Sequence, residues 1–188
     1  FYYTANDYTV TYYSTTKTTS YTTQSVKYNS SYSLPTAPTK DGFALVGWSQ
    51  DENNSSEWSS GTKTCTGNTT WYAVWKKTWK FYDTSSSAPS NTVNYAYNAN
   101  ASQSYSKANP TLSGYTFQGY ATSSTATAVS TGAGSSRTSL TSSSATPTYY
   151  AIWLSGSQSE DRTTTPTETT SGTISYDGNG STSGSTAN

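Results

Sequence analysis

The chain has 188 residues, a formal net charge of zero and only 11% charged residues, and it contains 36 serines and 38 threonines. Its 10 scattered Lys and Arg residues form no basic patch for nucleic acid, and no apolar run approaches the roughly 20 residues that cross a bilayer. Aliphatic residues are scarce, but 18 tyrosines and 6 tryptophans each combine a large apolar surface with a polar tip. Because Thr, Tyr, Trp and Val suit a pleated surface, we expect a mainly β protein with small aromatic cores.

Five short strands are expected in the first part of the chain. Alternation is clearest in the last of them, where Trp71, Ala73 and Trp75 fall on one face. Because proline interrupts a strand ladder, the stretch from Pro35 to Pro38 is expected to be a turn or an extended crossover. The strands are expected near residues 9–14, 22–28, 43–49, 62–66 and 71–75.

Two blocks of this first part recur later in the chain in the same order. Residues 38–48 read PTKDGFALVGW, and residues 110–120 read PTLSGYTFQGY. Residues 71–75 read WYAVW, and residues 149–153 read YYAIW. Because the first offset is 72 residues and the second is 78, the later copy has about six extra residues between the blocks. The sequence therefore predicts two copies of one β repeat.

Each copy has a glycine at the same two positions of the repeat. Gly42 and Gly114 stand where a turn requires a positive φ. Gly47 and Gly119 interrupt a strand, which predicts either a β-bulge or close packing under an aromatic ring.

The repeats set the expected domain boundaries. Only Lys76, Lys77 and Thr78 separate the two copies, so we expect their relative orientation to be fairly fixed. A Ser/Thr/Glu-rich stretch without aromatic residues then predicts a mobile linker, and Ile174 opens a third strand-like segment that is cut off. Because the chain does not begin with Met, we expect it to be a segment of something longer. The expected domains are an N-terminal extension or the end of a preceding unit at 1–8, repeat domains at 9–76 and 78–154, the linker at 155–172, and the beginning of a third repeat or an inter-subunit strand at 173–188.

No group of residues in the sequence indicates catalysis. Histidine is absent, which removes the usual general base and the commonest metal ligand. Cys65 is expected to be a small buried hydrophobic residue, with intermolecular pairing as the alternative. The acidic residues Asp51, Glu52 and Glu57 lack the spacing and the glycine of a calcium loop and predict a solvated turn, and Asp177 to Gly180 predicts a tight turn. We therefore predict no catalytic residue, no cofactor and no metal site.

Surface features leave several interpretations open. Trp58 lies outside both repeat blocks, and it either packs over its own repeat or stacks on a sugar ring. Phe1, Tyr2 and Tyr3 have no counterpart in the repeats and belong either to a preceding unit or to an interface strand. Six Asn-X-Ser/Thr sequons are uninformative, because about five would occur by chance in so Ser/Thr-rich a chain. The Thr tract around Pro166 is the better candidate for glycosylation.

The ordered blocks and the opening YDGNG at 176–180 resemble the Listeria–Bacteroides repeat, a B-repeat type of internalin-like surface proteins. This resemblance implies tandem, compact β-grasp-like repeat domains of about five short strands each, in long secreted or wall-attached proteins. It implies no catalytic residues. The opening turns after Tyr13 and Tyr82 depart from the family because they lack its Gly-rich form.

These observations favour a non-enzymatic structural segment of an extracellular or cell-surface-attached protein, such as a stalk, adhesin or fibre. In a variant of this hypothesis, terminal strands join copies of the chain into a filament. The alternatives are a carbohydrate- or protein-binding module and an accessory domain of a secreted hydrolase. The expected partners are accordingly further copies of the chain, or a cell-surface glycan or protein, with no nucleic acid and no membrane insertion.

Overall fold

The computed structural model describes residues 3–84 and 88–155, all within one compact unit that spans Phe1–Ser157. These residues form twelve strands and no helix, so the mainly β prediction is confirmed, and none of them supplies an apolar helix long enough to cross a membrane. The expected linker beyond Ser155, the third repeat and residues 1–2 lie outside the described residues. The strands are β1 (Asp7–Tyr13), β2 (Thr22–Lys27), β3 (Ser31–Ser33), β4 (Ala44–Ser49), β5 (Thr62–Thr64), β6 (Thr69–Tyr82), β7 (Ser90–Tyr95), β8 (Gln103–Ala108), β9 (Tyr115–Ala121), β10 (Thr131–Gly132), β11 (Arg137–Ser142) and β12 (Thr148–Ser155).

The first repeat has all five expected strands and one more. The additional strand, β3, has three residues and pairs antiparallel with β5. It was missed because three residues are too few to show alternation. The expected end of the last strand at residue 75 was wrong, because β6 continues to Tyr82. Lys76, Lys77 and Thr78, which were expected to separate the repeats, therefore lie in the middle of one strand.

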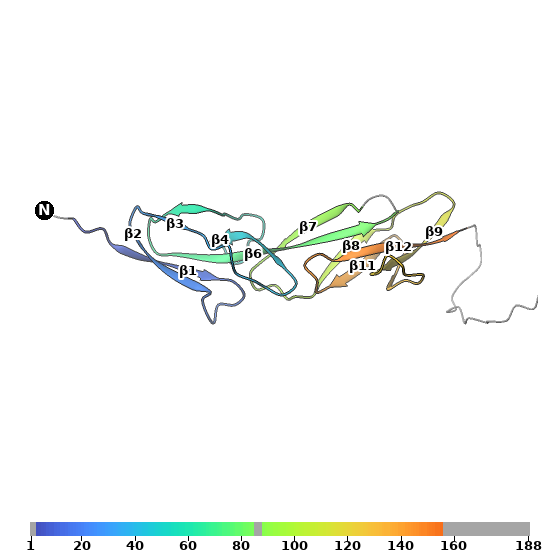
Figure 1. Cartoon of the computed structure of the whole chain (residues 1–188), viewed down its shortest axis with the longest axis horizontal. Coiled ribbons are helices and arrows are strands. Elements are labelled where there is room, and N and C mark those ends of the chain that lie inside the picture. Colours follow the sequence, from blue (N-terminus) through green and yellow to red (C-terminus); the bar gives the residue numbers. More distant parts are fainter. Residues whose placement is uncertain (1–2, 85–87, 156–188) are drawn as a thin grey trace, which may run out of the picture. The chain divides into compact units, whose positions relative to one another are not determined.

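Strand β6 is shared by the two repeats, and Figure 1 shows it running from the first into the second. The pairings of β6 show which strands lie along each of its two edges, because a residue that pairs with two strands must have one on each side. Tyr72 pairs with both β1 and β4, Trp75 with both β4 and β7, and Lys80 with both β7 and β12. One edge of β6 is thus paired first by β1 and then by β7, and the other first by β4 and then by β12.

The two halves of the large sheet have the same topology. In the first repeat the strand order is β2-β1-β6-β4, with β1 and β6 parallel and the outer pairs antiparallel. In the second the order is β7-β6-β12-β9, again with a parallel central pair between antiparallel neighbours. Each repeat adds a small separate pair, β3-β5 or β8-β11. The tandem-repeat prediction is confirmed, whereas the more specific β-grasp arrangement stays a prediction.

The glycines behave as their positions in the repeat predict. Gly42 and Gly114 have φ of 76° and 80°, as expected for turns of this kind. The β4–β6 register shifts between Leu45 and Gly47, and the β9–β12 register shifts opposite Gly119. Both strand glycines therefore mark a β-bulge, as predicted.

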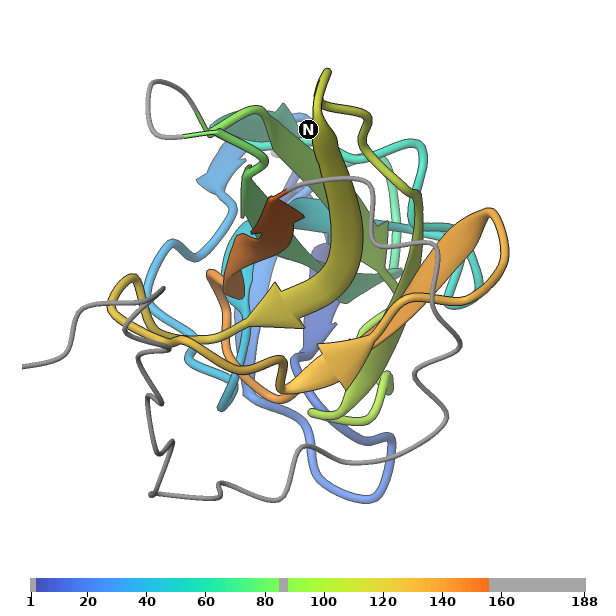
Figure 2. The ribbon, with the colours of Figure 1, turned by 90° about the vertical axis from the view of Figure 1, so that its right-hand side faces the viewer.

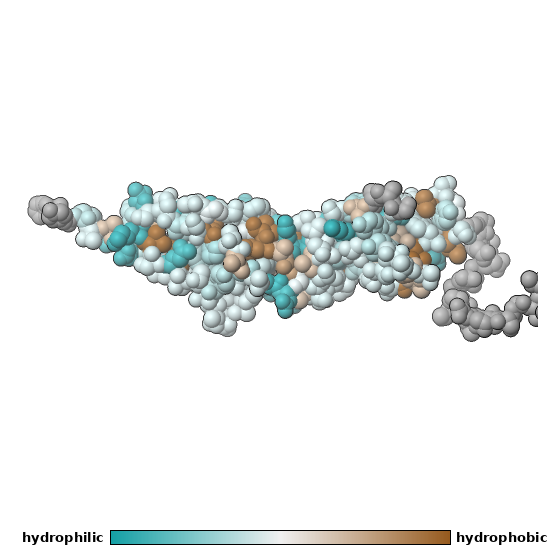
Figure 3. Space-filling view, in the orientation of Figure 1, coloured by the Kyte–Doolittle hydropathy of each residue, from teal (hydrophilic) through white to brown (hydrophobic). Residues whose placement is uncertain are grey.

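Each repeat has its own aromatic core on β6. The first core contains Tyr12, Trp48, Trp71 and Trp75, and the second contains Trp79, Phe81, Tyr120, Leu140 and Tyr149. Leu140 comes from β11, so the β8–β11 pair closes the second core; in Figure 2 this pair lies to one side of β9 and β12. The surface itself is mostly polar, and Figure 3 shows apolar residues only as small separate patches on the face in view.

Candidate functional site

The sequence features that were weighed for chemistry have structural positions. Cys65 is free and buried, as expected for a small hydrophobic residue, and its thiol lies 3.6 Å from the Val26 carbonyl oxygen. In the acidic loop, the Asp51 carboxylate accepts the Asn53 N–H at 2.9 Å, and Glu52 forms an ion pair with Lys17. No group of three or more His, Cys, Asp or Glu side chains in the described ranges could hold a metal ion. This loop is therefore organised by its own hydrogen bonds.

Trp58 packs on its own repeat with half of its surface exposed. The side chain is 46% exposed, and a Cβ atom placed on Gly47 would come within 2.7 Å of the Trp58 ring. Gly47 therefore combines both features that its position suggested, a bulge and close packing under an aromatic ring. Trp58 also borders an open hollow of about 330 Å³ whose other lining residues include Asp51, Asn54 and Glu57.

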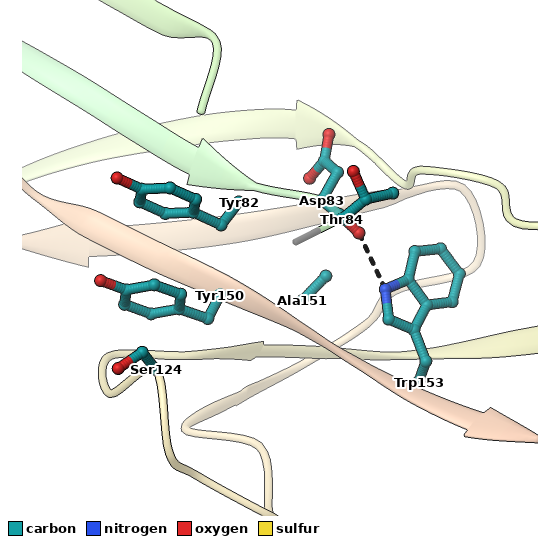
Figure 4. A pocket seen from close by; sticks show the side chains of 7 residues that line it. All are labelled: Tyr82, Asp83, Thr84, Ser124, Tyr150, Ala151 and Trp153. Atoms are coloured by element: carbon teal, nitrogen blue, oxygen red, sulfur yellow. Dashed lines mark hydrogen bonds between the residues drawn. The ribbon is translucent and has the colours of Figure 1, made fainter. Parts of the chain in front are cut away.

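An open cavity lies at the end of the second repeat, and we call it the aromatic cleft. Tyr82 of β6 and Tyr150 of β12 stack with their ring centroids 4.8 Å apart and 7° between their planes, as Figure 4 shows. Trp153 closes one side, and its indole N–H donates to the Asp83 carbonyl oxygen at 2.9 Å. The cleft has a volume of about 490 Å³. It is lined by Tyr82, Asp83, Thr84, Ser124, Tyr150, Ala151 and Trp153.

The carboxylate of Asp83 is directed into the repeat rather than toward a ligand. One oxygen accepts the Tyr120 hydroxyl at 2.7 Å, and the other accepts the Lys107 ammonium at 2.8 Å. Burial, together with this hydrogen bond and the carboxylate charge, raises the pKa of Tyr120 above its usual value. Both carboxylate oxygens of Asp83 therefore have partners within the second repeat.

The first repeat has the same ring stack and indole contact, and there a residue of the second repeat packs on them. Tyr13 and Tyr72 stack at 5.7 Å and 18°, and the Trp75 indole donates to the Ser14 carbonyl oxygen at 2.9 Å. Tyr97, which belongs to the second repeat, packs against Tyr72 at 5.1 Å and is only 5% exposed. Burial, and after it the neighbouring phenols of Tyr97 and Tyr13, raises the pKa of Tyr72. The second repeat thus packs on the ring stack of the first.

A buried lysine joins the two repeats at the centre of β6. The side chain of Lys77 is 0% exposed, and its ammonium donates to the carbonyl oxygens of Gly42 at 2.6 Å and Ser144 at 2.8 Å. These acceptors come from loops of different repeats. The ammonium also lies 4.3 Å from the centroid of the Phe43 ring. Burial lowers the pKa of Lys77, because the surrounding protein solvates its charge less well than water.

Three more contacts complete this boundary, which we call the junction. Phe43 packs edge-on against Tyr95 of the second repeat at 5.5 Å. The Lys40 ammonium donates to the Tyr97 carbonyl oxygen at 2.5 Å. Gly42 lies so close to the second repeat that a Cβ atom there would be 2.0 Å from the Ser143 carbonyl oxygen. The junction therefore contains a strand, a buried cation, two aromatic contacts and a backbone contact that only glycine allows.

The sequence predicted a fairly fixed orientation of the two repeats, which stays a prediction, but it did not predict the contacts at the junction. Lys77 was expected to lie in the short connection between the repeats, whereas it lies within β6. The signal that could have found it is alternation. Trp75, Lys77 and Trp79 fall on one face of a continuous strand, so a lysine stands in a row of buried aromatic residues.

Comparisons with known proteins agree with the internal repeat. The Listeria-Bacteroides repeat domain matches the chain twice, at residues 8–74 and 80–146. The chain is 40% identical over 76 residues to Internalin H of Listeria monocytogenes serovar 1/2a (strain ATCC BAA-679 / EGD-e). That alignment covers 40% of this chain and 13% of Internalin H, so only a small part of the relative is represented. No solved structure matches.

The two matched segments together cover well over half of the chain. The first contains β2, β4 and the start of β6, and the second contains β7 and β9 but ends before β12. The chain belongs to the Listeria-Bacteroides repeat domain family.

Proposed function

We propose that this chain is a non-enzymatic structural segment of a bacterial surface protein, in which consecutive repeats form a stiff spacer outside the cell. The family and the relative named Internalin H support the surface context. The observation that carries the structural role is β6, a 14-residue strand that is the last strand of one repeat and the first of the next.

A shared strand resists bending for a simple reason. Rotation of one repeat against the other would have to break the β6 pairings to β4 and β7 near Trp75, where both strands overlap along its two edges. It would also expose the buried ammonium of Lys77 and remove its two carbonyl partners. Leaving buried polar groups without partners costs roughly 1–3 kcal/mol for each group, so bent forms should be rare.

The composition agrees with this role. Most Ser and Thr residues of the described strands are exposed or half-buried, except Ser49 and Thr138, and many of the aromatic residues lie in the two cores and the junction. In the aromatic cleft, the Asp83 carboxylate accepts hydrogen bonds from Tyr120 and Lys107 of the same repeat. The aromatic side chains of this part of the molecule thus serve in packing.

A distance measurement between the repeats tests the stiffness. Spin labels at Ser31→Cys and Ser104→Cys, on exposed strand positions of different repeats, should give one narrow distance distribution by pulsed electron resonance. Cys65 is buried and should remain unlabelled. A label pair within the first repeat, Ser31→Cys with Thr23→Cys, gives the intrinsic width for comparison. A distribution between the repeats that is several times broader than this control would contradict the proposal.

A further inference from the structure

The outer ends of the described unit carry residues that correspond to the junction residues but lie uncovered. The repeated blocks align Phe43 with Tyr115 and Gly42 with Gly114. Strand register aligns Tyr95 with Tyr28: each lies two residues after a valine, Val93 paired with Lys77 and Val26 paired with Tyr8.

Exposure differs sharply between these counterparts. Phe43 is 8% exposed at the junction, whereas Tyr115 is 49% exposed at the end of the second repeat. Tyr95 is partly buried against Phe43, whereas Tyr28 is 53% exposed at the start of the first repeat. Tyr28 and Tyr115 thus correspond to the two residues, Tyr95 and Phe43, that pack against each other at the junction.

The backbone and the ring stacks show the same contrast. Gly114 has nearly the same φ as Gly42, yet a Cβ atom there would meet no atom of the described residues within 4 Å, whereas at Gly42 it would meet Ser143. Tyr97 packs against Tyr72, whereas the corresponding Tyr150 lines the open aromatic cleft. All of the uncovered features of the second repeat correspond to surfaces that the first repeat buries at the junction.

We propose that the chain associates end to end with a second copy of itself, Tyr28 of one copy packing on Tyr115 and the aromatic cleft of the next. This rests on the proposed structural function and specifies how such segments extend each other. A second copy fits these ends because, at the internal junction, the same two kinds of surface already pack against each other. The first repeat has one aromatic residue, Tyr28, where the second has Tyr95 and Tyr97, so the contact between copies contains fewer rings than the junction.

The contact is heterologous, because a surface of one end meets a different surface of the other. Such a contact does not close on itself in a dimer, and repeated addition gives a linear assembly. Within the chain, β6 holds the repeats together at an effective concentration in the millimolar range or above, and two separate copies lack this advantage. The association between copies is therefore weak, and it becomes visible at about 0.1–1 mM protein.

Sedimentation of the full chain over a concentration series tests the proposal. The mean mass of the wild-type protein should rise with concentration, and Tyr28→Ala and Tyr115→Ala should each weaken association about tenfold or more, since each removes a central aromatic contact. Both side chains are exposed, so circular dichroism should show folded variants. Tyr21→Ala removes another exposed tyrosine, 41% exposed and away from both ends, and should leave the mass curve unchanged.

A mixture of the two variants gives the sharpest result. The Tyr28→Ala copy retains its Tyr115 end, and the Tyr115→Ala copy retains its Tyr28 end, so an equimolar mixture should form 1:1 dimers that grow no further. A wild-type chain that remains monomeric at about 1 mM would overturn the proposal, and so would a mixture that stays monomeric. Neither result would affect the distance distribution within one chain, so a failure here is distinguishable from a failure of the spacer function.

Discussion

Among the described residues, the core of the first repeat includes residues of the other repeat and the core of the second does not, although the two repeats have the same topology. The first core includes Tyr97 from the second repeat, and Tyr95 and Ala99 pack at its margin. The second core is built from residues of β6, β9, β11 and β12, and its margin contains no residue before β6 among those described. The second repeat thus completes the core of the first, so the stability of the first repeat should depend on the second.

The largest effect is expected from adding one methyl group to a turn glycine. Gly42→Ala should lower the free energy of unfolding by about 3–4 kcal/mol, because positive φ strain adds to a clash with the Ser143 backbone. Gly114→Ala has the same φ but open space, so it should cost only about 1–2 kcal/mol. Urea denaturation of the two variants measures the difference. Equal losses would mean that the junction contact contributes nothing.

Removal of the buried lysine should have the next largest effect. Lys77→Ala leaves the carbonyl oxygens of Gly42 and Ser144 without their donor and opens space beside Phe43, so it should destabilise the protein by about 3 kcal/mol. Lys80 lies three residues away on the same strand and is exposed, and Lys80→Ala should change stability by no more than about 0.5 kcal/mol. Thermal unfolding at equal ionic strength compares them. A small effect of Lys77→Ala would show that the ammonium is replaceable by water.

The smallest effect on stability is expected from removing a tyrosine hydroxyl that the first repeat has and the second lacks. Tyr12 corresponds to Phe81, and its buried hydroxyl has no hydrogen-bond partner among the described residues. Tyr12→Phe removes that unpaired group and should be neutral or should stabilise the protein by about 1 kcal/mol at pH 7, as chemical denaturation can measure. A loss of more than about 1 kcal/mol would indicate that a water or another partner satisfies the hydroxyl.

The wild-type protein and the Tyr12→Phe variant should also differ in stability at alkaline pH. Burial, and after it the neighbouring Tyr32, raises the pKa of Tyr12 from 10.0 to about 12. A raised folded-state pKa contributes stability that is fully present below pH 10 and is lost as the pH rises through about 12. Lys77, with its lowered pKa, acts in the opposite direction, but it is present in both proteins and cancels in their difference. The advantage of Tyr12→Phe over the wild type should therefore increase between pH 9 and 12 in a denaturation series.

Much of this fold could be predicted from the sequence because its signals are local. The recurring blocks predicted the positions of β4, β9, β12 and the first half of β6, and the glycines in them predicted the bulges and the turns. Trp58 and Cys65 also lie as their structural interpretations expected. These features depend on alternation, backbone conformation and residue size, which a sequence shows directly.

The junction could not be predicted in the same way, because it depends on pairing between distant segments. Whether Lys77 is buried is decided by the loops that contain Gly42 and Ser144, 35 and 67 residues away. The aromatic cleft likewise forms from β6 and β12, and only the structure shows that Tyr97 packs on the corresponding ring stack of the first repeat. No local pattern marks either site.

Native-state hydrogen exchange after a mutation in one core tests the central claim that the repeats form one cooperative unit through β6. Leu140→Ala in the second core should destabilise the protein by about 2–5 kcal/mol. If the repeats unfold together, the amides of Val10 and Tyr12, the fully buried residues of β1, should lose protection by the same factor as the amides of β11. Unchanged protection of Val10 and Tyr12, with faster exchange confined to the second repeat, would contradict the account.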